Sequence, residues 1–213
     1  MRVETRLEPL VHIVDDDISM RDALVGLFDS VGLQSETYST ANDFLYTKLT
    51  ARPGCIVLDV RLPDMNGLEF QKRLTQIGVG IPVVMMTGFG DIPMSVRAMK
   101  LGAVDFLPKP FRDQDMLDAV LAAIERDRQR RAVDNNVSQI RKRFETLTPR
   151  EQEVMSHVTA GRMNKQVAGD LGISEITVKI HRGAAMHKMG ARTYAELVRM
   201  ADALNLDRHK IVR

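Results

Sequence analysis

The sequence has few of the features that mark secreted or membrane-embedded proteins. Its only cysteine, Cys55, cannot form a disulfide within one chain, which fits the reducing cytosol. No apolar stretch approaches the roughly 18 residues of a membrane-spanning helix, and the first residues, MRVETRLEPL, lack the apolar core of a signal peptide. These absences predict a cytoplasmic protein with no membrane partner, and a buried core thiol rather than a redox sensor at Cys55.

The net charge of +2 conceals an uneven distribution along the 213 residues. Residues 1–125 carry a net charge of −6, residues 126–143 carry +5 and residues 144–213 carry +3. This asymmetry predicts two modules with different partners, and a polyanion is the natural partner of the basic part. An ordinary solvated surface is the alternative explanation for the basic tail.

The first 125 residues alternate between strand and helix patterns. The runs CIVL and PVVMM are apolar without alternation, as expected for strands that are covered on both faces. Five such units predict an α/β doubly wound five-stranded parallel sheet with right-handed crossovers. Strands are predicted at 10–14, 33–38, 55–60, 83–87 and 104–107, and helices at 18–31, 41–50, 66–77, 91–101 and 112–130.

The remaining residues predict a linker and a small all-α domain. Residues 126–145 read as a charged, partly helical linker, with a helix break expected at Asn135–Asn136. From residue 146 the period is helical, which predicts a domain of four helices with a helix-turn-helix at 164–188. The expected helices cover about 149–160, 164–171, 175–189 and 193–204.

Capping signals fix the starts of these C-terminal helices. The run TPRE predicts a capping box, with Thr148 at the N-cap, Pro149 at the first helical position and Glu151 reaching back. Asn164 and Ser174 are expected to cap the second and third helices. The fourth helix has an apolar set that fits either core packing or a dimer seam.

Charged and polar side chains follow the predicted strands at their C-terminal ends. Asp59 ends the run CIVLD, the acids 15–17 follow LVHIV, Thr87 ends PVVMMT, and Lys109 follows VDFLP. In an open parallel sheet such groups gather outside the carboxyl ends of the strands, where the strand order reverses. The pattern therefore predicts one pocket suited to Mg²⁺ and a phosphoryl group. Asp17 is either a weak metal contact or merely polar, and Asp64 is expected to be a turn residue.

These motifs carry a family resemblance. The series VDDD, LDVRLPDMNG, MTG and PKPF resembles the receiver domain of two-component response regulators. The segments TPREQEV, NKQVAGDLGIS and TVKIH resemble the helix-turn-helix of the LuxR type. Together they look like the FixJ/NarL class of response regulator, with the FixJ branch nearest, over residues 10–205. The expected domains are a receiver at 1–125, a linker at 126–145 and a LuxR-type DNA-binding domain at 146–213.

The resemblance implies a role for each strand-end residue. Asp59 is the expected phosphoacceptor, and an acyl phosphate on a carboxylate is a feasible product. Asp15 and Asp16, with Asp59 and the backbone carbonyl of Arg61, are the expected ligands of Mg²⁺, the one cofactor. Lys109 would neutralise the phosphoryl oxygens, because these would otherwise face clustered carboxylates.

A conformational switch is also implied by the resemblance. Thr87 would move toward the phosphoryl group and Phe106, the switch aromatic, would turn inward; an ordinary core role for Phe106 is the alternative. This change would reposition a surface at about 91–106 and promote a homodimer. Lys109–Pro110 is a candidate cis peptide.

The third C-terminal helix, within SEITVKIHRGAAMHKM, would be the recognition helix. Lys179 stands where family members touch bases, and Val178 is expected in the core. Gly183 departs from the NarL pattern, in which a lysine often contacts a base. Arg192 is a further phosphate contact to be expected. The candidate DNA-binding residues are Lys165, Thr177, Lys179, Ile180, His181, Arg182 and Lys188.

The sequence therefore predicts a phosphorylation-activated transcription regulator rather than an enzyme, its only catalysis being its own phosphoryl transfer and autodephosphorylation. The implied partners are a histidine kinase, double-stranded promoter DNA, a second copy of the chain and RNA polymerase. Two alternatives remain open, a phosphate sink whose tail binds nothing specific and a regulator that works without phosphate.

Overall fold

The computed structural model describes residues 7–88 and 92–206, and the chain divides into two compact units, Met1–Arg131 and Ala132–Arg213. Each unit has its own hydrophobic core. Of the helices in the part of the chain that the structure describes, none is long and apolar enough to cross a membrane.

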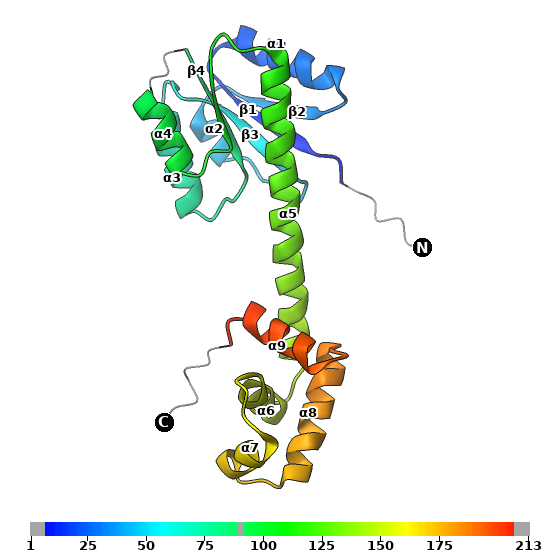
Figure 1. The fold of residues 1–213 in the computed structure, drawn as a ribbon. Helices are drawn as coiled ribbons and strands as arrows, with labels where there is room; N and C mark the ends of the chain where they lie inside the picture. Colours follow the sequence, from blue (N-terminus) through cyan, green and yellow to red (C-terminus); the bar gives the residue numbers. More distant parts are fainter. Residues whose placement is uncertain (1–6, 89–91, 207–213) are drawn as a thin grey trace. The chain divides into compact units, whose positions relative to one another are not determined.

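The first unit is built on a parallel sheet (Figure 1). The strand order is β2-β1-β3-β4-β5, so the chain runs to one side of β1 and then returns to its other side. This reversal places the carboxyl ends of β1 and β3 next to each other at the switch point. The predicted doubly wound five-stranded sheet is confirmed. Its strands are β1 (Leu10–Val14), β2 (Gln34–Tyr38), β3 (Gly54–Asp59), β4 (Val83–Thr87) and β5 (Asp105–Pro108).

Two apolar cores explain why the central strands lack alternation. Along β3, Cys55 and Val57 belong to the core with α1 and α5, whereas Ile56 and Leu58 belong to the core with α2, α3 and α4. Successive strand residues point to opposite faces, so a strand that is covered on both faces buries both sets of side chains and is mostly apolar. The covering helices are α1 (Ile18–Ser30), α2 (Ala41–Leu45), α3 (Gly67–Gln76), α4 (Ile92–Lys100) and α5 (Asp113–Glu145).

Cys55 is a core thiol, as expected. Its side chain is completely buried, and burial raises the pKa of the thiol, with the Asp127 carboxylate adding to the rise. The reactive thiolate is therefore disfavoured, which argues against a redox role.

Helix α5 corrects one expectation of the sequence. It runs through Asn135 and Asn136, where a break was predicted. An asparagine costs a helix interior only about 0.7 kcal/mol relative to alanine, and the surrounding arginine, glutamine and alanine residues favour the helix. The opposite error occurs at α2, which ends at Leu45 rather than near residue 50. There the Thr47 hydroxyl donates to the Asp43 carbonyl at 3.0 Å, a side-chain bond that competes with continued helix.

A buried carboxylate ties α5 to the start of β3. Asp127 is completely buried and accepts a hydrogen bond from the Gly54 backbone N–H at 3.0 Å. It also forms ion pairs with Arg130 at 2.7 Å and Arg131 at 2.6 Å. The two guanidinium groups satisfy the charge that burial would otherwise make costly.

Among residues 132–206, the second unit has the last part of α5 followed by four further helices. These helices share one core, which also includes Ile140 of α5 and Leu147. The capping box of Thr148 and Glu151 is present, and Ser174 caps its helix as predicted. Asn164 does not act as a cap. Met163 occupies the N-cap position and its backbone N–H donates to the Gln166 side chain at 2.9 Å, so Asn164 is the first helical residue. The helices are α6 (Pro149–Thr159), α7 (Asn164–Leu171), α8 (Glu175–Met189) and α9 (Tyr194–Ala203).

Candidate functional site: an acidic pocket and an exposed helix

The strand-end residues of the first unit meet in one pocket. The Lys109 ammonium donates to Asp15 at 2.7 Å and to Asp59 at 2.6 Å, joining the loops that follow β1 and β5 to the end of β3. The Lys109 backbone N–H also donates to the Thr87 carbonyl at 2.7 Å. Along the chain Lys109 lies 94 positions from Asp15 and 50 positions from Asp59. The parallel sheet, rather than proximity in sequence, therefore brings these three side chains together.

Three carboxylates of this pocket could hold a cation. Oxygen atoms of Asp15, Asp16 and Asp59 all lie within 4.8 Å of one another. Asp15 and Asp59 are buried, whereas Asp16 is exposed and keeps one side of the cluster open to solvent. Mg²⁺ prefers hard oxygen ligands and usually retains water, so the donor set and its open side fit this ion.

The protonation balance of the pocket follows from burial and pairing. Burial raises the pKa of Asp15, and the hydrogen bonds from Lys109 and from the Asp17 backbone N–H oppose this rise only in part. For Lys109, burial lowers the pKa, but the bonds to Asp15 and Asp59 outweigh it, so the pKa is raised. Lys109 therefore stays an ammonium ion, and this ammonium neutralises part of the negative charge of the three carboxylates.

Loops around Asp59 fix its carboxylate. The Arg61 backbone N–H donates to Asp59 Oδ1 at 3.0 Å. Gly67 closes the loop with a backbone hydrogen bond to the Val60 carbonyl at 2.8 Å. A Cβ atom at Gly67 would lie 2.7 Å from the Asp59 carbonyl oxygen, so only glycine allows this approach.

The two proposed switch residues lie on neighbouring strands. Thr87 is completely buried at the end of β4. Phe106 faces Met85 across the β4–β5 ladder, is half-buried, and packs against the core beneath α4. The predicted switch surface begins at Asp91, which lies outside the described residues. The predicted cis peptide at Lys109–Pro110 is present.

Two neighbouring acids have structural roles. Asp17 is the N-cap of α1 and accepts hydrogen bonds from the backbone N–H groups of Ser19 and Met20, which favours the polar interpretation over a metal contact. Asp64, expected in a turn, accepts from the backbone N–H groups of Ala41 and Asn42 at 3.2 and 2.9 Å. It thus caps α2 from a distant loop, a pairing that no local sequence pattern indicates.

In the second unit, α8 presents an exposed basic and apolar face. Lys179 is exposed, and Ile180 exposes 64% of its surface, an unusual placement for isoleucine. Ile176, one helical turn earlier, exposes 71% and was missed by the sequence reasoning. Val178 is completely buried, as predicted. A helix face of this composition can enter a DNA groove, where methyl groups and base edges are both available.

The remaining predicted DNA contacts differ in how exposed they are and in whether they already form hydrogen bonds within the protein. Lys165 is exposed on α7, and His181 is half-buried on α8. The Thr177 hydroxyl is hydrogen-bonded to that of Ser174 at 2.8 Å. The Arg192 backbone N–H donates to the Glu196 side chain. At Gly183 no atom outside the adjacent residues and the backbone of α8 itself lies within 4 Å of a Cβ position, so the helix surface is open there.

Two basic residues are engaged within the second unit. The Lys188 ammonium binds both oxygens of Glu151, at 2.9 and 2.6 Å, so its predicted phosphate contact would compete with this ion pair and stays a prediction. Local charge suggested a DNA contact because the sequence does not reveal that α6 supplies a carboxylate to α8. Arg182 Nη1 donates to the Asn164 side chain at 3.3 Å, so this guanidinium is also positioned by a neighbouring helix.

Replacing Glu151 by glutamine is expected to weaken the second unit and to change its response to acid. The hydrogen bond from Lys188 and those from the Thr148 backbone N–H and side chain hold the pKa of Glu151 below its usual value of 4.5. The stability from this lowered pKa is present above pH 4.5 and is lost as pH falls through the folded-state pKa. Thermal melting between pH 7 and 3 should show a lower melting temperature at pH 7 for Glu151→Gln and a smaller acid-induced loss.

The exposed Glu175, on α8 and without a role in this cap, provides the matched control. Glu175→Gln should follow the wild-type pH curve. Equal acid sensitivity of wild type and Glu151→Gln would contradict the assigned role of the Glu151–Lys188 pair.

Comparisons with known proteins identify the family of each domain. Residues 11–121 match the model of the response regulator receiver domain, and residues 145–201 match that of bacterial regulatory proteins of the luxR family. Nodulation protein W of Bradyrhizobium diazoefficiens is 53% identical over 203 residues, covering 95% of this chain and 89% of that protein. The transcriptional regulatory protein FixJ of Rhizobium meliloti is 42% identical over 191 residues, covering 90% and 94%. The solved structure of the response regulator StyR is similar with a TM-score of 0.79 and 46% identity, over 92% of this chain and 98% of that one.

Proposed function

Because this chain belongs to the FixJ-like response regulators, which join a receiver domain to a LuxR-type DNA-binding domain, we propose that phosphorylation of Asp59 controls its binding to promoter DNA. The main support for this proposal is that Lys109 contacts both Asp15 and Asp59, in a pocket whose three carboxylates fit a divalent cation. A histidine kinase is the proposed phosphoryl donor, and RNA polymerase is a proposed partner at the promoter.

The chemistry assigned to the pocket follows from its residues. The Asp59 carboxylate is held by the Arg61 backbone N–H and by Lys109, and attacks the phosphorus atom of the donor, whose leaving group departs with the electron pair. Lys109 then faces the new phosphoryl oxygens. Asp15, Asp16, Asp59 and the carbonyl of Arg61 would hold Mg²⁺, which supplies positive charge that screens the incoming phosphoryl group from the carboxylates.

The proposed output is a change in the surface of α4 and β5. Helix α4 exposes an apolar stripe at helical spacing, formed by Ile92, Val96 and Met99, which are 81%, 45% and 48% exposed. An exposed stripe of this kind favours association with a second copy. Thr87 ends β4 beside Pro108 of β5, and Phe106 of β5 packs against the core that α4 covers, so the phosphoryl group would favour the dimer through them.

Replacing Thr87 by alanine is expected to separate phosphorylation from dimerisation. The Asp59 pocket remains, so acyl-phosphate labelling should persist, but the hydroxyl that would bond the phosphoryl group is lost. Phosphorylation should tighten the wild-type dimer by tenfold or more, equivalent to at least about 1.4 kcal/mol, and should tighten the Thr87→Ala dimer by less than about twofold. Sedimentation velocity with and without beryllofluoride measures both values. An undiminished response in Thr87→Ala would contradict the switch, and Thr75→Ala, on α3, serves as the control.

Replacing Lys179 by alanine is expected to weaken sequence-specific DNA binding. A side chain that bonds a base edge contributes about 1–3 kcal/mol of discrimination, so affinity for a selected site should fall roughly 10- to 100-fold while binding to random DNA changes little. Lys165→Ala, at a proposed phosphate contact, should weaken both kinds of binding and reduce the salt slope by about one. Fluorescence anisotropy at several salt concentrations distinguishes the two patterns. Identical losses on both DNAs for Lys179→Ala would assign it to the phosphate backbone instead.

The proposed function is tested by acyl-phosphate labelling of the full chain. In the presence of Mg²⁺ one phosphoryl group should appear, and reduction with borohydride followed by peptide mass spectrometry should locate it at Asp59. Chelation of Mg²⁺ should abolish the label. Labelling without any effect on DNA binding would favour the phosphate sink, and DNA binding without labelling would favour the phosphate-independent regulator.

A further inference from the structure

Helices α3 and α4 line a cleft that has no part in the proposed phosphorylation. Its volume is about 780 Å³, within the roughly 300–1,000 Å³ of small-molecule sites. An apolar wall is formed by Met65, Leu68 and Met94. The cleft therefore offers both the space and the apolar surface that an organic ligand requires.

The charge of the cleft contrasts with the unit that contains it. Lys72, Arg73 and Arg97 line it, with Glu69 as the one carboxylate. Within residues 7–88 and 92–206, none of these three cations forms an ion pair or a hydrogen bond through its side chain. Residues 1–125 nevertheless carry a net charge of −6. A local excess of positive charge in an acidic domain attracts anions to this one position.

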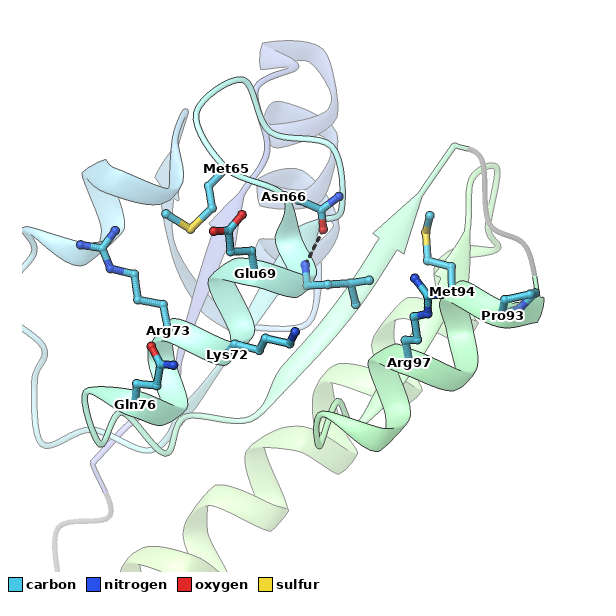
Figure 2. A pocket seen from close by; sticks show the side chains of 10 residues that line it. Met65, Asn66, Glu69, Lys72, Arg73, Gln76, Pro93, Met94 and Arg97 are labelled. Atoms are coloured by element: carbon cyan, nitrogen blue, oxygen red, sulfur yellow. Dashed lines mark hydrogen bonds between the residues drawn. The ribbon is translucent and has the colours of Figure 1, made fainter.

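Two of the cations converge on the same space. Figure 2 shows Lys72 extending from α3 toward α4, and Arg97 standing on α4 beside Met94 on the facing side. Arg73 points away from α4 in the same view. An ammonium and a guanidinium on facing helices can share one anion, and the planar guanidinium can donate two parallel hydrogen bonds to it.

We propose that this cleft binds a small organic acid, whose anionic group lies between Lys72 and Arg97 and whose apolar body lies against Leu68 and Met94. Both requirements are needed, since a bare anion leaves the apolar wall unused and a neutral compound leaves the two cations unpaired. The site does not depend on Asp59 or on Mg²⁺, so binding takes place in the unphosphorylated protein.

The test is a calorimetric titration of the full, unphosphorylated chain with 1-naphthalenesulfonate, which combines one anionic group with an apolar body. Wild-type protein should bind one equivalent, and amide chemical shifts should change at Leu68–Lys72 and Met94–Arg97. The Lys72→Ala/Arg97→Ala variant should bind at least tenfold more weakly. The neutral analogue 1-naphthalenemethanol and sodium sulfate should each bind at least fivefold more weakly than the sulfonate.

A matched variant controls for net charge. Lys48 and Lys100 are exposed and lie outside the cleft, so Lys48→Ala/Lys100→Ala removes the same charge and should bind like wild type. The proposal is overturned if both double variants bind equally, if the neutral analogue binds as well as the sulfonate, or if wild-type protein shows no binding at millimolar concentration. Melting curves of all three proteins verify that the variants are folded. None of these results depends on phosphorylation, so failure here leaves the role of Asp59 unaffected.

Discussion

An Asp59→Ala variant is expected to lose phosphorylation completely, with labelling by an acyl phosphate falling at least 100-fold. The Asp59 carboxylate is the only one that contacts both Lys109 and the Arg61 backbone N–H within the described residues. Asp15 is completely buried, and its oxygens accept hydrogen bonds from Lys109 and from the Asp17 backbone N–H, so it is less accessible to a phosphoryl donor. Mass spectrometry of the intact chain measures the label directly.

The same variant should retain its fold. Removing one member of a carboxylate cluster relieves repulsion, and the Lys109–Asp15 pair at 2.7 Å remains. The melting temperature should therefore stay within a few degrees of wild type. Asp22→Ala, at an exposed acid of α1, should label normally. Label that persists in Asp59→Ala at the wild-type level would contradict the assignment of the phosphoacceptor.

Replacing Lys109 by methionine is expected to destabilise the metal-free protein and to block the response. The variant keeps the aliphatic stem but leaves the buried Asp15 and Asp59 carboxylates without a cation. Removing one partner of a buried ion pair lowers the free energy of unfolding by about 3 kcal/mol. Chemical denaturation at pH 7 in the presence of a chelator measures this loss. Addition of Mg²⁺ should restore more stability to Lys109→Met than to wild type, because the metal then replaces the missing cation.

A pH series gives this prediction a second, independent measurement. Without Lys109, burial and the neighbouring Asp59 carboxylate raise the pKa of Asp15 further, and only the hydrogen bond from the Asp17 backbone N–H opposes the rise. Lowering the pH from 7 should therefore relieve part of the destabilisation as Asp15 takes up a proton. Lys100→Met, at an exposed lysine of α4, should show neither the loss nor the rescue. A Lys109→Met protein as stable as wild type in chelator at pH 7 would show that the ammonium does not neutralise this pocket.

The strand-end residues were predictable because one geometric rule governs them. Asp59, Thr87 and Lys109 each follow an apolar run, and a parallel sheet delivers such positions to one edge whatever the details of the loops. The helices of the second unit were predictable for a related reason, since capping signals such as Thr148–Glu151 act over three residues and need no knowledge of the fold.

Side-chain partners that depend on the packing of a particular helix were not predictable. Asp127 bonds Gly54 across 73 positions of the sequence, and Glu151 bonds Lys188 across 37. Such pairs depend on how helices pack, which periodicity does not encode. The same limit explains why Ile176 was missed as a candidate DNA contact, since only the packed structure leaves it 71% exposed.

The most direct test of the account measures DNA affinity and oligomeric state together, with and without beryllofluoride and Mg²⁺, for wild type and Asp59→Ala. Beryllofluoride stands in for the phosphoryl group on the carboxylate and does not turn over. A tighter and dimeric DNA complex in treated wild type alone is the predicted result. Equal binding and equal mass in all four samples would contradict control by Asp59.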